Sequence, residues 1–285
     1  MIQKILTPID IDIESSETVV KYALELSKVF GAKLVYFHVY LPPNINNPTP
    51  HSIGGTGVST QSIPPIPIDH EAIKQNQFKN LIDKVPEATS VPYDYYSGPV
   101  VVDDFYKKYV EKLDIDLVLI GTSEVLGIEA FIGTKAEKVT RSAPCPVIVI
   151  PREYPFRAIK KICLAIDHDH TIDEHDLSIL LLIAKGLDTP VYIIHVQRST
   201  DEGEEPRAGL LLELKKKMEK YQINYSFCNI PSEDVERGIT EFTERNQIDL
   251  LALVYREHGF FKRLFNPGIR KKLVSQSELP LLILK

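Results

Sequence analysis

One loop of the sequence combines glycines, a hydroxyl and a helix start in the way that phosphate binding requires. It runs from Gly121, which ends an apolar run, through Gly127 to Gly133 and Thr134, where a helical pattern begins. Glycines let backbone N–H groups approach a phosphate, and a helix N-terminus offers free N–H groups and a positive dipole end. A strand-to-helix connection also needs glycine for its turn, and Thr134 can simply cap the helix. From the residues alone, both interpretations stay open.

A second set of candidate residues follows the first two apolar runs. Asp10 comes directly after Pro8 and Ile9, and its carboxylate could accept hydrogen bonds from a base or a ribose. Val39 lies near the end of the second run. In an open parallel sheet, ligands bind beyond the carboxyl ends of the strands, where the strand order reverses. We therefore expect Pro8, Asp10 and Val39 to meet the loop that starts at Gly121.

The elements that must position these residues alternate between strand and helix. Residues 3–9 form a short apolar strand, a helical pattern then runs to Phe30 and stops at Gly31, and residues 33–39 form a nearly continuous apolar strand. Such runs are apolar on both faces, which is typical of a parallel sheet covered by helices. The pattern continues with predicted helices at 68–84, 101–113 and 133–142 and predicted strands at 91–96, 117–121 and 147–150. It predicts an α/β fold.

The same pattern occurs twice along the chain, which indicates two copies of one domain. The repeated segments are Ile5–Asp10 with Ile162–Asp167, His38-Val39 with His195-Val196, Ile115–Val118 with Ile248–Leu251, and Val147–Ile150 with Leu281–Leu284. The second copy has predicted strands at 161–167, 190–196, 223–228, 249–254 and 280–284 and helices at 174–186, 207–221, 233–246 and 267–277. We expect domains at 1–151 and 157–285, joined by a proline-containing linker. A long loop rich in proline and glycine, 41–68, interrupts the first domain.

Four segments of the chain resemble the universal stress protein family in its tandem form. They are ILTPID at 5–10, ALELSKVFGAKLVYFHVY at 23–40, DLVLIGTS at 116–123 and IGTKAEKVTRSAPCPVIVIP at 132–151. The resemblance covers the chain apart from 41–68. It implies two open, five-stranded, mostly parallel sheets with helices on both faces, of the Rossmann-like kind also called adenine nucleotide alpha hydrolase-like. It also implies that the two copies form a pseudo-dimer, paired through strands 147–150 and 281–284.

The resemblance further implies an ATP site in the first copy. Many family members bind ATP through the motif G-x2-G-x9-G-(S/T), with Pro-x-Asp after the first strand and a valine after the second. Carried over, Pro8, Asp10 and Val39 surround the adenosine. The ribose and the phosphates are expected to bind to the loop residues Gly121, Gly127, Gly133 and Thr134. The implied ligand is ATP or another adenine nucleotide, with Mg²⁺ as a companion ion.

Two departures from the motif bear on this site. Glu124 stands where the second glycine belongs, and eleven residues separate Gly121 from Gly133, one fewer than in the motif. A carboxylate beside a triphosphate is repulsive unless a metal ion bridges the two. The second copy departs further, because Val254 and Tyr255 replace the strand-end glycine and Pro267-Gly268 lacks the hydroxyl. We expect no ATP there.

Other signals in the sequence favour ordinary structural roles. The glycines at 54–57 lack a strand before them and are typical of a flexible loop. The cluster Asp167–His170, with His175 and Asp176 after it, has metal-ligand types but is expected to be a solvated loop. The aromatic and cationic run 258–265 is expected to be a helix with a buried apolar face. His38 and His195 are interpreted as core histidines with one satisfied nitrogen.

Composition limits the function. The 285 residues carry a net charge of −6, which disfavours nucleic-acid binding, and no apolar run is long enough for a bilayer. Three cysteines without paired spacing and no signal-peptide pattern predict buried thiols in a cytoplasmic protein. We expect a stress-response binding and regulatory module rather than an enzyme. The alternatives are a slow nucleotide hydrolase with a metal on Asp10 or Glu124, and a scaffold without ligand. A homodimer is left open.

Overall fold

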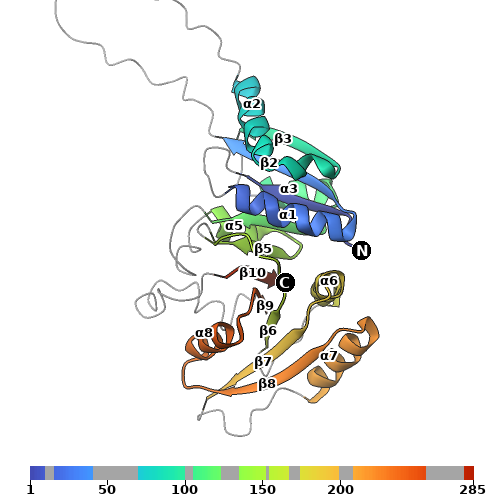
Figure 1. Cartoon of the computed structure of the whole chain (residues 1–285), viewed down its shortest axis with the longest axis vertical. Coiled ribbons are helices and arrows are strands. Elements are labelled where there is room, and N and C mark those ends of the chain that lie inside the picture. The colour runs from blue at the N-terminus through green and yellow to red at the C-terminus, as the bar shows by residue number, and fades with distance from the viewer. Residues whose placement is uncertain are drawn as a thin grey trace, which may run out of the picture.

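Two halves of the chain form one continuous sheet. The computed structural model describes residues 1–9, 16–40, 70–99, 105–122, 135–151, 154–166, 174–198, 208–254 and 279–285. Within these ranges, ten strands follow the order β3-β2-β1-β4-β5-β10-β9-β6-β7-β8 (Figure 1). The predicted pair of five-stranded α/β sheets is confirmed, and the two sheets are joined edge to edge.

The five strands of the leading half and the five of the trailing half have the same internal arrangement. The leading strands are β1 (Lys4–Pro8), β2 (Lys33–Tyr40), β3 (Tyr93–Pro99), β4 (Leu117–Gly121) and β5 (Val147–Ile150). The trailing strands are β6 (Ile162–Ile166), β7 (Val191–Gln197), β8 (Tyr225–Pro231), β9 (Leu250–Val254) and β10 (Leu281–Leu284). All neighbours within a half are parallel. The first strand of each half lies in the middle of its set, so the strand order reverses beside it.

The seam between the halves is an antiparallel pair of last strands. Leu281 of β10 lies opposite Val149 of β5, and Ile283 lies opposite Val147. This is the pairing that the family resemblance implied. Because the seam is antiparallel, the carboxyl ends of the leading strands and those of the trailing strands lie at opposite edges of the sheet.

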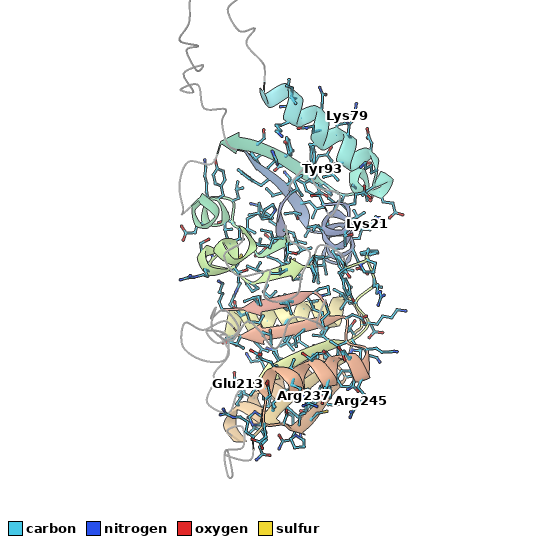
Figure 2. The ribbon with its side chains drawn as sticks, turned by 90° about the vertical axis from the view of Figure 1, so that its left-hand side faces the viewer. Lys21, Lys79, Tyr93, Glu213, Arg237 and Arg245 are labelled. Atoms are coloured by element: carbon cyan, nitrogen blue, oxygen red, sulfur yellow. The ribbon has the colours of Figure 1, made fainter. Side chains whose placement is uncertain are left out.

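Helices cover both faces of the sheet. One face packs against α1 (Ser16–Phe30), α2 (His70–Asp83), α6 (Glu174–Gly186) and α7 (Ala208–Tyr221), and the other against α3 (Phe105–Lys112), α5 (Lys135–Ser142) and α8 (Val235–Asn246) (Figure 1). Exposed charged side chains, among them Lys79, Glu213 and Arg245, lie on the outer sides of α2, α7 and α8 (Figure 2). In the described part of the chain, no helix has both the length and the apolar character that crossing a membrane requires.

The ends of the helices follow local sequence rules. The first helix stops where Gly31 adopts a left-handed backbone with φ of 63°, which is a conformation that glycine adopts without strain. A short 3₁₀ helix (Pro86–Ser90), which the sequence pattern did not predict, precedes β3.

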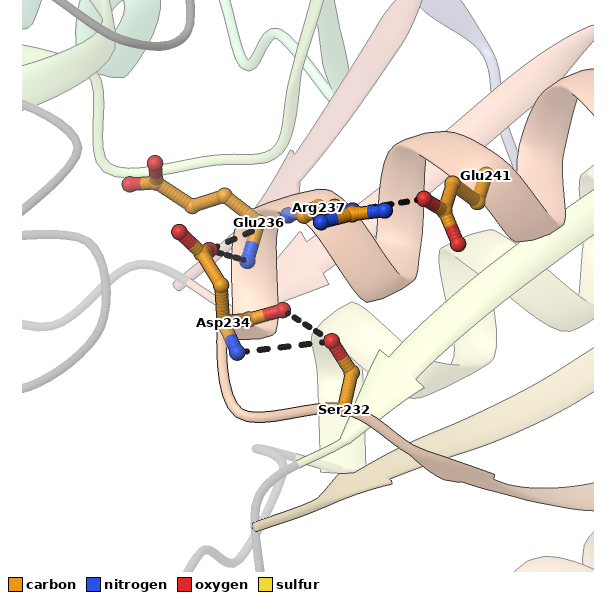
Figure 3. A network of polar contacts seen from close by, with 5 residues as sticks. All are labelled: Ser232, Asp234, Glu236, Arg237 and Glu241. Carbon is orange, nitrogen blue, oxygen red and sulfur yellow. Dashed lines mark hydrogen bonds and ion pairs between the residues drawn. The ribbon is translucent and has the colours of Figure 1, made fainter.

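The trailing helix α8 begins with an acidic cap. Asp234 Oδ1 accepts hydrogen bonds from the backbone N–H groups of Glu236 and Arg237, at 3.0 and 3.1 Å (Figure 3). The Ser232 hydroxyl donates in turn to the Asp234 carbonyl oxygen, at 2.7 Å. The N-terminus of α8 is therefore satisfied by a carboxylate of the protein itself.

An aspartate fixes the start of the central strand in the leading half. Asp116 Oδ2 accepts from the backbone N–H groups of Gln3 and Lys4, at 2.7 and 3.0 Å. The Lys4 Nζ donates to the Leu113 carbonyl oxygen just after α3, at 2.7 Å. A strand, a loop and a helix end are thereby tied together.

The trailing half repeats this arrangement atom for atom. Asp249 Oδ2 accepts from the N–H groups of Lys160 and Lys161, at 2.9 and 3.0 Å. The Lys161 Nζ donates to the Asn246 carbonyl oxygen at the end of α8, at 2.8 Å. The Ile-Asp-Leu repeat in the sequence therefore marks a repeated structural device.

Contacts beside the seam also join the two halves. A Cβ added to Gly186 of α6 would lie 2.6 Å from Val29 Cγ1 in α1, so the glycine permits this close approach. In the linker, the Phe156 ring packs edge-on against Tyr22 with centroids 4.9 Å apart. Phe156 of the linker therefore lies against α1. The boundaries 1–151 and 157–285 stay a prediction.

Candidate functional site

Three of the predicted site residues lie at one edge of the leading half. Pro8 ends β1, Val39 is next to last in β2, and Gly121 ends β4, and these three strands are neighbours in the sheet. From β1 the chain adds β2 and β3 on one side, and then β4 and β5 on the other. The edge where these residues end is therefore the point of strand reversal, at which open α/β sheets bind ligands.

The other predicted site residues lie outside the described part of the chain. They are Asp10, Gly127, Gly133 and Thr134, together with Glu124. The described helix α5 begins at Lys135, directly after Gly133 and Thr134 in the sequence. The described part of the predicted helix 133–142 is helical, and its predicted start at Gly133 and Thr134 stays a prediction.

Gly121 has a packing role that the sequence did not specify. A Cβ at this position would lie 2.8 Å from Val19 Cγ2, which is closer than two carbon atoms approach. The missing side chain therefore lets α1 close over the end of β4. Beyond it, the Thr122 N–H donates to the Ile150 carbonyl oxygen at 3.0 Å, which extends the pairing of β4 with β5.

A buried histidine secures the strand end that precedes Asp10. His38 Nδ1 lies 3.1 Å from the Ile9 carbonyl oxygen, and the residue is 2% exposed. The trailing half has the same contact between His195 Nδ1 and the Ile166 carbonyl oxygen, at 3.3 Å. The interpretation of both residues as core histidines with one satisfied nitrogen is confirmed.

The register of the sheet shows which trailing residues replace those of the leading edge. Leu117 pairs with Ile5 as Leu250 pairs with Ile162, so the strand-end position of Gly121 is taken by Val254.

The same comparison extends to the helix and to the last strand. In each half the same number of residues separates the first strand from the second, and the first helix lies between them. Asp176 in α6 is therefore equivalent to Val19 in α1. Ile150 pairs with the last residue of β4, and Leu284 pairs with the last residue of β9. These two residues are therefore equivalent, and Lys285, which follows Leu284, is equivalent to Pro151.

Asp176 and Lys285 form a polar contact at the trailing edge. Asp176 is 3% exposed, and its Oδ2 accepts a hydrogen bond from the Lys285 backbone N–H. The Lys285 Nζ donates to the Thr140 carbonyl oxygen in α5 of the leading half. His175 and Asp176 lie in α6, so the helix predicted at 174–186 is confirmed for them. Asp167–His170 lies outside the described residues.

Burial sets the ionisation of this contact. Desolvation lowers the pKa of Lys285 to about 8, while nearby Cys145 and Asp176 act in the opposite direction. Burial also raises the pKa of the Cys145 thiol to about 12. The sequence had not singled out Lys285 or Thr140, and the signal available was the replacement of apolar Val19 by an acid in the second copy.

The three cysteines are all free thiols. Cys145 and Cys163 are buried as predicted, whereas Cys228 on the edge strand β8 is only half-buried. Burial raises the pKa of Cys163 and of Cys228, so neither is expected to be a reactive thiolate near neutral pH.

The remaining sequence signals cannot be placed. The glycines at 54–57 and the run 258–265 lie outside the described residues. Among the side chains that the structure describes, no three or more His, Cys, Asp or Glu residues gather in a way that could hold a metal ion.

Two linked, doubly wound five-stranded sheets define a tandem α/β protein of the Rossmann-like type. Residues 97–151, which include the glycine loop and α5, match the universal stress protein family. The resemblance seen in the sequence is therefore confirmed for that segment. A comparison with curated protein sequences finds no match.

Solved structures with the same fold extend over the whole chain. A universal stress protein from Archaeoglobus fulgidus DSM 4304 is 14% identical, with 99% of this chain and 96% of that chain covered and a TM-score of 0.67. A functionally unknown protein from Pseudomonas aeruginosa PAO1 is 15% identical, with 100% and 92% covered and a TM-score of 0.62. At this level of identity the similarity shows the shared fold.

Proposed function

We propose that the protein is a stress-response binding module with one adenine nucleotide site at the leading edge of its sheet. The observation that carries this proposal is the convergence of Pro8, Val39 and Gly121 on adjacent strand ends where the strand order reverses. The family match over 97–151 supports it, because that segment contains the glycine loop.

The chemistry of the described leading edge fits an adenosine. Pro8 and Ile9 are buried, and Gly121, Thr122 and Pro151 complete an edge without charged side chains. An uncharged, mostly apolar edge suits a purine base, whose recognition depends on packing and a few hydrogen bonds. Asp10 would follow Ile9 as the acceptor for the base or ribose.

The phosphates would lie at the start of α5. In the sequence α5 follows Gly133 and Thr134, neither of which has a carboxylate, and the first N–H groups of a helix attract anions. The start of α8 gives the contrast, because Asp234 already occupies its N–H groups. Glu124 would weaken a triphosphate by repulsion unless Mg²⁺ lies between them.

We propose that the trailing half binds no nucleotide. Val254 adds a side chain where the leading half has Gly121, and Asp176 places a carboxylate at the edge that an anionic ligand would have to approach. Free thiols at all three cysteines agree with action in the reducing cytoplasm.

Two measurements test the proposal. Chromatography of the denatured protein will show whether an adenine nucleotide is carried through purification. Calorimetry with ATP, with and without Mg²⁺, is expected to give one site per chain, stronger in Glu124→Gly and unchanged in the trailing-half control Val254→Gly. Absence of binding in both measurements would support the scaffold alternative. Phosphate release at a steady rate would support the slow hydrolase.

A further inference from the structure

Lys285 contacts both halves of the molecule through two different atoms. Its backbone N–H donates to Asp176 Oδ2 in α6 of the trailing half. Its side-chain Nζ donates to the Thr140 carbonyl oxygen in α5 of the leading half. The residue directly follows β10, the trailing strand of the seam, so its backbone position is fixed by the sheet.

The contact on α5 lies in the last turn of that helix, where backbone carbonyl groups have no partner within the helix. The last four carbonyl groups of a helix have no partner within the helix. The Ala143 N–H donates to the Val139 carbonyl oxygen at 2.8 Å. The Lys285 Nζ donates to the next carbonyl oxygen, that of Thr140. A cation at this end also interacts favourably with the helix dipole. With eight residues, α5 is too short to be stable without tertiary contacts.

Two other lysines provide a comparison within the same molecule. Lys4 donates to the Leu113 carbonyl oxygen after α3, and Lys161 donates to the Asn246 carbonyl oxygen at the end of α8. Each of these lysines belongs to the same half as the helix end that it contacts. Lys285 makes the same kind of contact on a helix of the other half.

The leading half cannot make the reciprocal contact. Pro151 stands at the position of Lys285, and proline has neither a backbone N–H nor a cationic side chain. Val19 stands at the position of Asp176 and packs against Gly121 instead. The contact therefore runs one way, from the trailing half to the leading half.

We propose that Lys285 and Asp176 are positioning residues through which the trailing half sets the nucleotide affinity of the leading half. This inference rests on the proposed function, because the N-terminus of α5 is the proposed phosphate site. A helix of this length is only about 12 Å long, so we expect a displacement of its last turn to reach its first turn. Holding its last turn against Lys285 therefore fixes where its first N–H groups point.

Calorimetry with Mg-ATP on the full chain tests this inference. We expect Lys285→Met and Asp176→Asn each to weaken ATP binding about fivefold or more, the lower end of usual coupling between sites. Lys285→Arg keeps the cation and is expected to restore most of the affinity. The matched control is Lys161→Met, which removes the equivalent contact on α8 and is expected to leave ATP affinity within about twofold of the wild type.

Hydrogen exchange supplies a readout that does not require the nucleotide. Amides at the end of α5 are expected to exchange faster in Lys285→Met than in the wild type, and those of α8 faster in Lys161→Met. Wild-type affinity in Lys285→Met and Asp176→Asn would overturn this inference and leave the proposed function intact. A wild-type chain that binds no ATP overturns both. If Lys285→Met does not fold, Asp176→Asn, which keeps the side-chain shape, decides the question.

Discussion

The two halves share one backbone plan and differ at the edges where ligands would bind. The pairing of the central strands, the aspartate that ties them and the buried histidine recur in both halves with similar distances. Among the described residues, the positions at which the edges differ include Gly121, Val19 and Pro151, which are replaced by Val254, Asp176 and Lys285.

These three differences belong together physically. In the leading half, Val19 packs where a side chain on Gly121 would lie, and Pro151 has no N–H group to donate a hydrogen bond. In the trailing half the helix position carries an acid, and the residue after the last strand supplies the N–H that satisfies it. The trailing half therefore has an internal polar contact where the leading half has an apolar one.

The largest effect on stability is expected from introducing the aspartate of the trailing half at the equivalent position of the leading half, without its N–H partner. Val19→Asp places a carboxyl group at a position that is 3% exposed, opposite a proline that offers no N–H. We expect a loss of about 3–5 kcal/mol in the free energy of unfolding, as for other unpaired buried charges. Denaturant unfolding measures it, with Val19→Ala as the control for lost packing. Equal costs for the two variants would show that the partner at 151 is irrelevant.

A smaller effect is expected from copying the strand-end residue. Gly121→Val brings a Cβ to 2.8 Å from Val19 Cγ2, so α1 must shift outward. Overpacking of this kind costs about 1–3 kcal/mol of unfolding free energy, and we expect ATP binding to be lost with it. Val19→Ala in the same chain should recover part of the stability. If the double variant is no more stable than Gly121→Val alone, the packing explanation is wrong.

The smallest effect is a pH dependence of the trailing contact. Burial lowers the pKa of Lys285 from 10.5 to about 8, so between these values the unfolded chain binds more protons and stability rises with pH. Cys145 and Asp176 face this lysine, and the raised pKa of Cys145 acts against stability above pH 9. We therefore expect a rise on the order of 1 kcal/mol between pH 7.5 and 9 that is absent in Lys285→Met. Parallel profiles for the two proteins would contradict it.

Most of the fold could be predicted because its signals are local. Strands 117–121 and 147–150 were predicted at their observed bounds, since short runs apolar on both faces leave little choice of boundary. Helix 174–186 was also placed correctly. The 3₁₀ helix at Pro86–Ser90 was missed, because so short a helix has no periodicity to detect.

The site was predictable only in part. The placement of Pro8, Val39 and Gly121 follows from strand ends and topology, which sequence patterns specify. The roles of Val19, Thr140 and Lys285 depend on contacts between elements more than 100 residues apart, or on the exact closeness of a helix to a strand. Such contacts leave no local pattern in the sequence. The comparison of two copies, position by position, was the signal that could have found them.

The antiparallel pair β5 and β10 has a consequence for how the molecule responds to dilution. Two separate subunits joined by such a pair would part at low concentration, whereas here one polypeptide carries both strands. Tethering makes their meeting intramolecular, at an effective concentration on the order of millimolar or above. The leading half therefore keeps its paired strand even where only a few copies of the protein are present.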